Sequence, residues 1–355
     1  MKIAITHVDL PNESRGGVAY QVHYLANELA SRGHNVTMFT FSPHFTDCLY
    51  KVHRYALAPK LRRFQSFFLA AFLSRTDFSS FDVIHSHGDN YLLWGRHPQV
   101  RTFHGSARDE AASAVSLKRR LNQYLGTFLE RVGACVADWN VGVSQATRIR
   151  IPKVETIVPC GVDTRLFHPG AKSQNPTVLF VGTSGGRKRG NLLAEVFCKE
   201  IRFRHPSAQL WAVSESPLKG EGIVNFGKIE LDHLTELFRQ AWVFCLPSTY
   251  EGFGVPYAEA LASGTAVVSS PNPGAQEVLE QGRFGIIAED SQLGAEIGRL
   301  LQDRSKREDF EIRGLPRSRE FDWSHVASRY EELYRATGER CAASGRVAIV
   351  KNSQS

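Results

Sequence analysis

The sequence predicts an α/β protein of two domains, each a parallel sheet covered by helices. The chain has 355 residues, more than one ordinary hydrophobic core holds and enough for two domains of about 150 to 180 residues. Apolar runs of four to eight residues alternate with longer segments of helical period, as expected when helices cover a parallel sheet. This alternation occurs twice, and each series opens with its own apolar strand.

The first series begins at the amino terminus. Lys2–Thr6 predicts a strand, a loop ending in Gly16-Gly17 follows it, and a helix is expected over about Val18–Ser31 with Gly33 as its stop signal. Further strands are expected at Val36–Thr40, Val83–His85, Val100–Phe103, Asn140–Val143 and Thr156–Val158.

The second series begins at the apolar run Val178–Val181. A Gly-rich basic turn and a helix over about Asn191–Glu200 follow this strand. Further strands are expected at Gln209–Ala212, Ile223–Asn225, Trp242–Leu246 and Ala266–Ser269.

Turn formers and polar residues without an apolar period fill the segment 167–176 between the two series. We therefore expect the hinge there, with an N-terminal lobe over 1–168 and a C-terminal lobe over 169–322. Residues 323–338 are expected to form a helix that crosses back to the N-terminal lobe, and 339–355 a flexible tail.

The composition excludes several classes of protein. Hydrophobic residues make up 42% and charged residues 22%, as in a globular protein and unlike a disordered or fibrous one. No stretch reaches the ~20 apolar residues of a spanning helix, and the start lacks a basic-then-apolar signal. The six cysteines contain no C-x-x-C pair for zinc or redox work. We expect a cytoplasmic protein.

The net charge of +7 is unevenly distributed. Residues 1–169 hold 20 Lys and Arg against 13 Asp and Glu, whereas residues 170–355 hold 23 of each. A basic surface attracts nucleic acid, an anionic membrane or a phosphorylated substrate, and charge alone does not choose among them.

The stretch 247–264 carries the densest pattern of functional residues. A strand ending at Leu246 leads into a loop with Gly252 and Gly254, and Pro256 suits the first turn of a following helix. Glycines allow a ligand to approach the backbone, and helix N-termini attract phosphates. Glu251 and Glu259 would accept hydrogen bonds from sugar hydroxyls. The alternative is a capped core helix whose glutamates face solvent.

Three other features are candidate binding elements. Gly182 ends the first strand of the second series and precedes the cations Arg187-Lys188-Arg189, which could bind a diphosphate or form a solvated turn. Gly16-Gly17 would bring the loop and the helix amides near a ligand, but G-x-G-x-x-G is absent, so this is no dinucleotide fingerprint.

Histidines end two strands of the first series. His104 follows Val100–Phe103 at a position facing a site between the lobes, although a lone histidine is more often structural. His85 and His87 are interpreted as residues that shape the end of the sheet. No third ligand appears at zinc-site spacing.

The stretch P-S-x-Y-E-G-F-G-x-P-x-x-E-A-x-A-x-G resembles the signature of the retaining glycosyltransferases of family four. Further landmarks of that family lie in family order up to about residue 338, at 81–87, 102–105, 143–144, 158–163 and 321–323. The resemblance implies the GT-B fold, two Rossmann-like lobes with parallel sheets facing a central cleft. The N-terminal lobe would bind the acceptor and the C-terminal lobe the nucleotide sugar. One departure is Thr183, where many relatives have arginine after the glycine.

The resemblance also implies roles for single residues. Glu259 would bind the ribose hydroxyls, and Glu251 would contact the donor sugar near the reacting centre. Arg187 and Lys188 would neutralise the diphosphate, with Arg189 as the alternative partner. The amides of Phe253, Gly254 and Val255, together with Gly16, Gly17 and Gly182, would border the donor, and His104 would bond the donor sugar or orient the acceptor.

The expected reaction is metal-independent transfer of a hexose with retention of configuration. The donor would be a nucleotide-diphosphate sugar, with UDP favoured and GDP the other candidate, and the acceptor a glycan, a lipid-linked molecule or a small molecule. No cofactor is expected, and no D-x-D element calls for a metal ion. The alternatives are a nucleotide-sugar epimerase or hydrolase on the same fold and a non-catalytic protein that binds anionic ligands.

The basic first half suggests a partner surface. Lys60–Leu73 predicts a helix with a basic start and an aromatic apolar face, and Lys118-Arg119-Arg120 adds a second basic cluster. We hypothesise that this lobe docks peripherally on an anionic membrane to reach its acceptor, and that it does not bind nucleic acid. The alternative is a core-facing helix with its charges in water.

Overall fold

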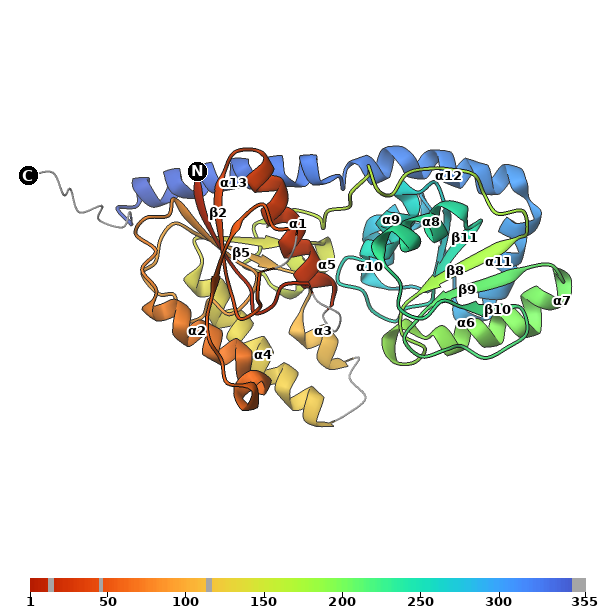
Figure 1. Cartoon of the computed structure of the whole chain (residues 1–355), viewed down its shortest axis with the longest axis horizontal. Coiled ribbons are helices and arrows are strands. Elements are labelled where there is room, and N and C mark those ends of the chain that lie inside the picture. Colours follow the sequence, from red (N-terminus) through yellow and green to blue (C-terminus); the bar gives the residue numbers. More distant parts are fainter. Residues whose placement is uncertain (12–15, 45–46, 113–116, 347–355) are drawn as a thin grey trace, which may run out of the picture. The chain divides into compact units, whose positions relative to one another are not determined.

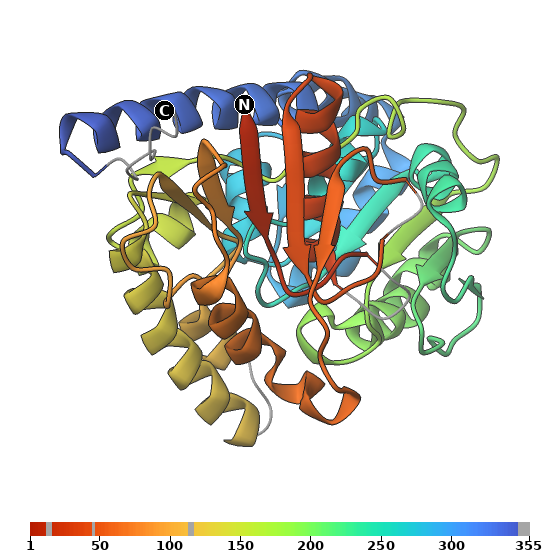
Figure 2. The same cartoon turned by 60° about the vertical axis from the view of Figure 1, so that its left-hand side comes forward.

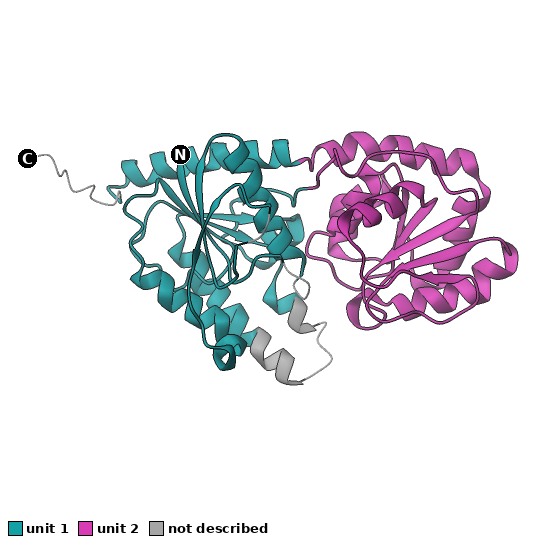
Figure 3. Cartoon of the chain, in the orientation of Figure 1, with its two compact units in different colours: residues 1–161, 323–355 teal, residues 162–322 magenta. Residues whose placement is uncertain are grey.

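The computed structural model describes residues 1–11, 16–44, 47–112 and 117–346, with the stretches 110–112 and 117–123 described by their backbone alone. The basic cluster Lys118-Arg119-Arg120 therefore lies outside the described side chains. The chain divides into two compact units (Figure 3): unit 1 is Met1–Gly161 with Trp323–Ser355, and unit 2 is Val162–Asp322. Each contains an all-parallel sheet with helices, which confirms the predicted fold class.

Unit 1 is built on a seven-stranded sheet of order β3-β2-β1-β4-β5-β6-β7 (Figure 1). Its strands are β1 (Lys2–Thr6), β2 (Asn35–Thr40), β3 (Lys51–Arg54), β4 (Val83–Ser86), β5 (Gln99–Phe103), β6 (Trp139–Gly142) and β7 (Thr156–Ile157). Its helices are α1 (Gly17–Ser31), η1 (Pro59–Phe64), α2 (Gln65–Arg75), α3 (Ala107–Ala112), α4 (Leu117–Val136), α5 (Gln145–Arg150) and α13 (Trp323–Ala343).

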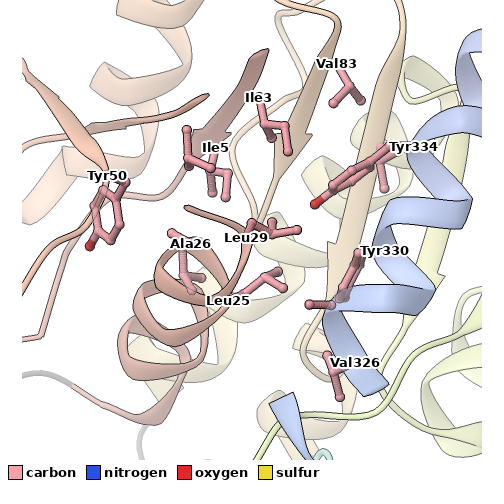
Figure 4. Close-up of a cluster of buried hydrophobic side chains, with 14 of the residues drawn as sticks. Ile3, Ile5, Leu25, Ala26, Leu29, Tyr50, Val83, Val326, Tyr330 and Tyr334 are labelled. Carbon is pink, nitrogen blue, oxygen red and sulfur yellow. The ribbon is translucent and has the colours of Figure 1, made fainter. Parts of the chain in front are cut away.

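Helices cover both faces of this sheet. On one face, Ile3 and Ile5 of β1 pack with Leu25 of α1 and with Tyr330 and Tyr334 of α13 (Figure 4). On the other face, side chains of α2 and α4 pack against Ala4 and Ile84. Figures 1 and 2 both show α2 and α4 on the side of the sheet away from α13. Strands buried on both faces are mostly apolar, which is why most of these strands were readable in the sequence as short apolar runs, although β5 also buries Gln99, Arg101 and Thr102.

Unit 2 is built on a six-stranded sheet of order β10-β9-β8-β11-β12-β13. Its strands are β8 (Thr177–Val181), β9 (Gln209–Val213), β10 (Ile223–Asn225), β11 (Val243–Leu246), β12 (Ala266–Ser269) and β13 (Ile286–Ile287). Its helices are η2 (Gly186–Lys188), α6 (Gly190–Val196), η3 (Phe197–Ile201), α7 (Arg202–Arg204), α8 (Leu231–Gln240), α9 (Val255–Ala262), α10 (Pro273–Val278), η4 (Glu280–Gly282), η5 (Asp290–Gln292), α11 (Leu293–Gln302) and α12 (Arg304–Arg319).

The boundary between the units differs from the predicted hinge. The chain passes from one unit to the other at Gly161/Val162 and at Asp322/Trp323, whereas segment 167–176 belongs to unit 2. Phe167 there is buried beside Phe238, and the Lys172 ammonium donates to the carbonyls of Ala241 and Gly264 at 2.9 and 2.7 Å. Turn-forming composition marks an irregular segment but does not show which core anchors it.

Three helix and strand predictions need correction. The helix expected over Lys60–Leu73 is the 3₁₀ helix η1 followed by α2, and Pro59 lies at the start of η1. The helix of residues 323–338 continues to Ala343, into the expected tail. The edge strand β3 was missed because its residues are mostly exposed and carry no apolar run. In the described part of the chain, no helix has the length and apolarity needed to cross a bilayer.

Candidate functional site

The two candidate segments of unit 2 meet at the carboxyl ends of adjacent strands. β8 and β11 pair directly, so the basic turn after β8 and the glycine-rich loop after β11 emerge side by side, the usual location of ligand sites in parallel sheets. The backbone N–H of Thr249 donates to the carbonyl of Arg187 at 2.9 Å. This hydrogen bond joins the turn to the loop.

Glu251 lies between two of the predicted cations. Its Oε1 is 2.9 Å from Nζ of Lys188, and its Oε2 is 3.2 Å from Nη1 of Arg187. The Arg187 guanidinium also donates to the carbonyl of Tyr250 at 2.7 Å. Glu251 is only 5% exposed, and a carboxylate this buried needs such partners. The three groups carry one net positive charge, which favours an incoming anion.

Gly182 explains how Lys188 reaches this position. A Cβ atom built on Gly182 would lie 3.2 Å from the Cβ, Cγ and Cδ atoms of Lys188, closer than ordinary van der Waals contact. The glycine therefore lets the lysine side chain lie along the backbone at the end of β8. The glycine at position 182 is therefore explained by the packing of the Lys188 side chain against it.

Arg189 is held differently from its two neighbours. Its backbone is left-handed, with φ of 53°, and its guanidinium binds Asp290 at 2.6 and 2.8 Å, Ser270 Oγ at 2.9 Å and the Pro247 carbonyl at 2.6 Å. These partners fix Arg189 between the loop and η5. The three cations of the turn therefore have two roles: Arg187 and Lys188 contact Glu251, and Arg189 anchors the turn.

The loop enters α9 through a tight turn. Gly254 has φ of 91°, and a Cβ there would lie 2.4 Å from the Tyr257 ring, so only glycine fits. Phe253 is buried against Phe321, which fixes the chain just before Val255 begins the helix. The N–H groups of a first helical turn have no partners inside the helix, so these residues present donors at the end of the sheet.

Glu259 lies one turn into α9 and is partly buried. Burial raises the pKa of its carboxyl to about 7, and the nearby Lys188 opposes this increase. The two glutamates of the motif therefore differ in environment: Glu251 is paired with two cations, and Glu259 is held in desolvated surroundings.

A polar network beneath the loop was not predicted from the sequence. The amide of Asn272 donates to Tyr257 Oη at 3.0 Å and to the Ser248 carbonyl at 3.2 Å, and its Oδ1 accepts from Ala275 N at the start of α10. A Cβ on Gly274 would lie 2.7 Å from Glu251 Cβ. The Asn-Pro-Gly run that begins α10 was the available signal, because asparagine before proline is typical of a helix N-cap.

The predicted residues of unit 1 also lie at the carboxyl ends of adjacent strands. His104 follows β5, and its Nε2 is 2.8 Å from Nδ1 of His87, which follows β4. His85 is bonded to Tyr334 Oη at 2.7 Å and to Thr102 Oγ1 at 2.8 Å. Burial lowers the pKa of His85 and of His104 to about 3 and that of His87 well below 6.5. His104 is therefore a member of a neutral cluster.

Gly16 and Gly17 lie at the start of α1, with Gly16 as its N-cap residue. Both are exposed, and a Cβ on either would have no neighbour within 4 Å among the described residues. Local packing therefore gives no reason for two glycines here. Their role as a close approach for a ligand stays a prediction.

One group of possible metal ligands occurs among the described residues, and it contains none of the predicted site residues. It consists of His97, Asp138 and Cys341. His97 Nδ1 lies 2.7 Å from Asp138 Oδ2, and Asp138 also accepts from the Gln99 amide at 2.9 Å. Both hydrogen bonds, the second from the backbone N–H of Gln99, are accepted by Asp138 Oδ2 at the amino end of the sheet.

Comparison with known families matches both halves of the chain. Residues 15–166 match the model "Glycosyltransferase Family 4", and residues 175–303 match "Glycosyl transferases group 1". The phosphatidyl-myo-inositol mannosyltransferase of Mycobacterium tuberculosis is 26% identical, over 93% of this chain and 94% of that protein. An MMP α-(1→4)-mannosyltransferase of Mycolicibacterium hassiacum is 28% identical over 70% of this chain, which spans 62% of that protein.

Solved structures share the fold. Sucrose-phosphate synthase from Thermosynechococcus elongatus superposes with a TM-score of 0.79 at 23% identity, over 96% of this chain and 99% of that one. Anabaena HepE, solved in complex with UDP and glucose, gives a TM-score of 0.74 at 16% identity, over 95% and 100%. The structural matches show the GT-B fold, and the two family models, which match residues 15–166 and 175–303, show that the chain belongs to the glycosyltransferases of family 4.

Proposed function

We propose that this protein transfers a hexose from a nucleotide-diphosphate sugar to an acceptor hydroxyl, with retention of configuration and without a metal ion. The observation that carries the proposal is the Glu251 carboxylate held between Lys188 and Arg187 beside the first turn of α9. Two cations and a set of helix amides suit a diphosphate, and a buried carboxylate suits sugar hydroxyls.

In the reaction, the bond between the anomeric carbon and the diphosphate breaks, and the diphosphate leaves with the electron pair. The acceptor oxygen then bonds to the same face of the sugar, and its proton passes to the departing phosphate. Negative charge thus develops on the leaving group, where Arg187 and Lys188 stabilise it. No protein nucleophile takes part in this scheme.

Glu251 has two roles in this proposal. Without a donor it forms ion pairs with Lys188 and Arg187, at distances of 2.9 and 3.2 Å. When the diphosphate binds, the cations move their hydrogen bonds to phosphate oxygens, and the released carboxylate accepts hydrogen bonds from the donor sugar. Glu259 accepts from the ribose hydroxyls, and the tight turn at Gly254 brings the amides of residues 253–255 to the phosphates.

The relatives suggest which donors to test first. Mannosyl transfer is named for the relatives from Mycobacterium tuberculosis and Mycolicibacterium hassiacum, and HepE was solved with UDP-glucose. We therefore propose a UDP- or GDP-hexose donor, with mannose and glucose as the first sugars. A thermal-shift panel of UDP, GDP, ADP and CMP tests the base, because a ligand that binds the folded state raises its apparent stability.

Product analysis tests the reaction itself. Purified protein is incubated with each nucleotide sugar, with and without candidate acceptors, and the products are analysed by mass spectrometry and anomeric NMR. A glycoside with the donor's anomeric configuration, formed only with acceptor, is expected. Epimerised sugar or free hexose as the main product would favour the epimerase or hydrolase alternative, and nucleotide binding without turnover would favour the non-catalytic one.

The surface of unit 1 supports peripheral membrane docking. Leu69, Ala70 and Leu73 of α2 are buried in the core, so one stripe of the helix is core-facing, as the alternative interpretation held. Other apolar side chains of α2, α4 and the connecting segments are exposed, namely Leu61, Phe64, Phe67, Leu92, Trp94, Tyr124, Leu125 and Phe128. Lys60, Arg62 and Arg63 are also exposed. Exposed aromatics flanked by cations suit an anionic lipid surface.

Liposome flotation tests the docking proposal. The protein should float with vesicles containing about 30% anionic lipid and less with neutral vesicles, because each basic residue near an anionic surface contributes about 1 kcal/mol. The double variant Phe64→Ser/Phe67→Ser should lose flotation, whereas Phe203→Ser, which removes an exposed aromatic from unit 2 (85% exposed), should not. Equal partition onto neutral and anionic vesicles would exclude the docking surface.

A further inference from the structure

His87 and His104 form a largely buried pair of imidazoles at the carboxyl ends of β4 and β5. His87 Nδ1 is 2.8 Å from His104 Nε2, and the rings are stacked with centroids 5.1 Å apart and planes at 27°. His87 is 7% exposed. Among the described residues, the buried nitrogens His87 Nε2 and His104 Nδ1 have no hydrogen-bond partner. A buried polar atom without a partner is costly unless a ligand or water satisfies it.

The surroundings keep both rings neutral. The titratable groups that face His87 are His7, His85 and His104, with no carboxylate among them, and burial together with these neighbours lowers its pKa. The His85 ring lies against the His87 ring, with centroids 4.1 Å apart and planes tilted by 42°. A hydrogen bond between two neutral imidazoles has one donor and one acceptor, so the tautomers of the two rings are coupled.

Two arrangements are possible. If His87 Nδ1 donates, His104 carries its own proton on Nδ1 and offers a donor there. If His104 Nε2 donates, its Nδ1 is a bare acceptor. Whether His104 Nδ1 is a donor or an acceptor therefore depends on which of the two rings donates in the bond between His87 and His104.

We propose that His87 is a positioning residue that holds the His104 ring and fixes it in one tautomer, so that His104 Nδ1 meets a hydroxyl of the reacting sugar with a defined hydrogen-bonding character. This proposal rests on the proposed function and on the role that the family resemblance implies for His104, contact with the donor sugar or the acceptor. The same 2.8 Å bond that fixes the tautomer also removes rotation of the His104 ring. A fixed ring raises the rate mainly through orientation.

Two variants distinguish the contribution of His87 Nδ1 from that of His87 Nε2. His87→Asn keeps a hydrogen-bonding group near the position of Nδ1 and removes Nε2, whereas His87→Leu removes both. Ser86→Ala is the matched control, because Ser86 is a buried neighbour on β4 whose hydroxyl has no partner among the described residues. Thermal unfolding of each variant reports any general loss of structure.

Nitrogen-15 NMR of labelled histidines reads the tautomer without substrate. Wild type and His87→Asn should show His104 in one neutral tautomer at pH 7, and His87→Leu should show averaged shifts. In kinetics, we expect His87→Leu to lower kcat by about 10- to 100-fold with a donor KM within about threefold of wild type. His87→Asn and Ser86→Ala should stay within about threefold in both constants.

Several results would overturn the proposal. Averaged tautomer shifts for His104 in wild type, or unchanged shifts in His87→Leu, would exclude control by His87. An Asn variant as slow as the Leu variant would assign the role to Nε2 instead. If His87→Leu does not fold, the His104 tautomer in the wild-type spectrum and the rate of His87→Asn still test the proposal. Absence of any transferase activity would remove the proposed function but leave the tautomer measurement intact.

Discussion

The two candidate regions both lie at the carboxyl ends of adjacent parallel strands but differ in charge. In unit 2 the segments after β8 and β11 hold a carboxylate and two cations within 3.2 Å. In unit 1 the segments after β4 and β5 hold stacked imidazoles whose pKa values are lowered by burial. In both units the candidate ligand site lies at the carboxyl ends of parallel strands. The residues at those strand ends determine whether the site is charged or neutral.

This difference has a consequence for pH. Each buried histidine of unit 1 binds protons less readily in the folded protein than in the unfolded one, so its contribution is lost on acidification. Glu259 of unit 2 binds its proton more readily when folded, so its contribution is lost as the pH rises. The two regions should respond to pH in opposite directions.

Loss of the charged site should have the largest effect. Glu251→Gln and Lys188→Ala should each reduce kcat/KM by about 100- to 1000-fold. Lys188 supplies preorganised positive charge to the leaving group, which is worth about 3 to 4 kcal/mol, and Glu251 supplies the carboxylate that binds the donor sugar in the proposed reaction. Initial rates with saturating acceptor measure the effect. Lys199→Ala is the control, because Lys199 is exposed in unit 2 and its one ion pair among the described residues is with the exposed Glu195. Near-normal rates in the first two variants would place the catalytic groups elsewhere.

Acidification should weaken unit 1 first. His85, His87 and His104 should together reduce local stability by up to about 4 kcal/mol per pH unit below pH 6.5, at about 1.4 kcal/mol each. Hydrogen exchange corrected for intrinsic rates should show protection falling between pH 6.5 and 5.5 in β4 and β5 before β8 and β11. Equal losses in both sheets would mean that the histidine cluster is already hydrated or charged.

The cations of the basic turn should separate stability from activity. Arg189→Ala should destabilise the protein by about 2 to 3 kcal/mol, because it removes charge-assisted hydrogen bonds to Asp290 and the Pro247 carbonyl. Arg187→Ala should cost less stability but lower kcat about tenfold or more. Denaturation midpoints and initial rates on the same preparations test both. The reverse order would make Arg189 the diphosphate ligand.

Glu259 should give the smallest effect. Its pKa of about 7 exceeds the usual value of 4.5, so its contribution is present below pH 4.5 and is lost as the pH rises through 7. Between pH 5 and 8, the free energy of unfolding of the wild type should therefore fall by about 1 to 3 kcal/mol relative to that of Glu259→Gln. Denaturant unfolding of both proteins at each pH measures this difference. A constant difference would mean that Glu259 titrates normally.

Much of the fold was predictable because the central strands of buried parallel sheets form short, mostly apolar runs. The runs at Lys2–Thr6 and Val178–Val181 opened the two series, and each is a central strand of its sheet. The edge strand β3 gave no such signal, since its side chains are mostly exposed. The hinge prediction failed because the anchoring contacts of segment 167–176 are long-range, as the bonds from Lys172 to Ala241 and Gly264 show.

Only the local features of the candidate site were predictable from the sequence. The spacing of glycines and glutamates in 247–264 and the basic triplet at 187–189 were local features, readable from the chain alone. The partners beneath them were not, because Asn272 and Gly274 reach the loop from α10. The separation of Arg187 from Arg189 likewise depends on Asp290, which lies far along the chain.

The sequence by itself determined two α/β units, the motif residues, and the excess of positive charge in the first half. Those properties follow from local pattern and composition, which need no knowledge of distant contacts. Only the tertiary structure decided that Glu251 binds Lys188 and Arg187, and that His104 pairs with His87. Such pairs form across loops of different strands, and their geometry depends on the order of strands in the sheet, which the local sequence does not encode.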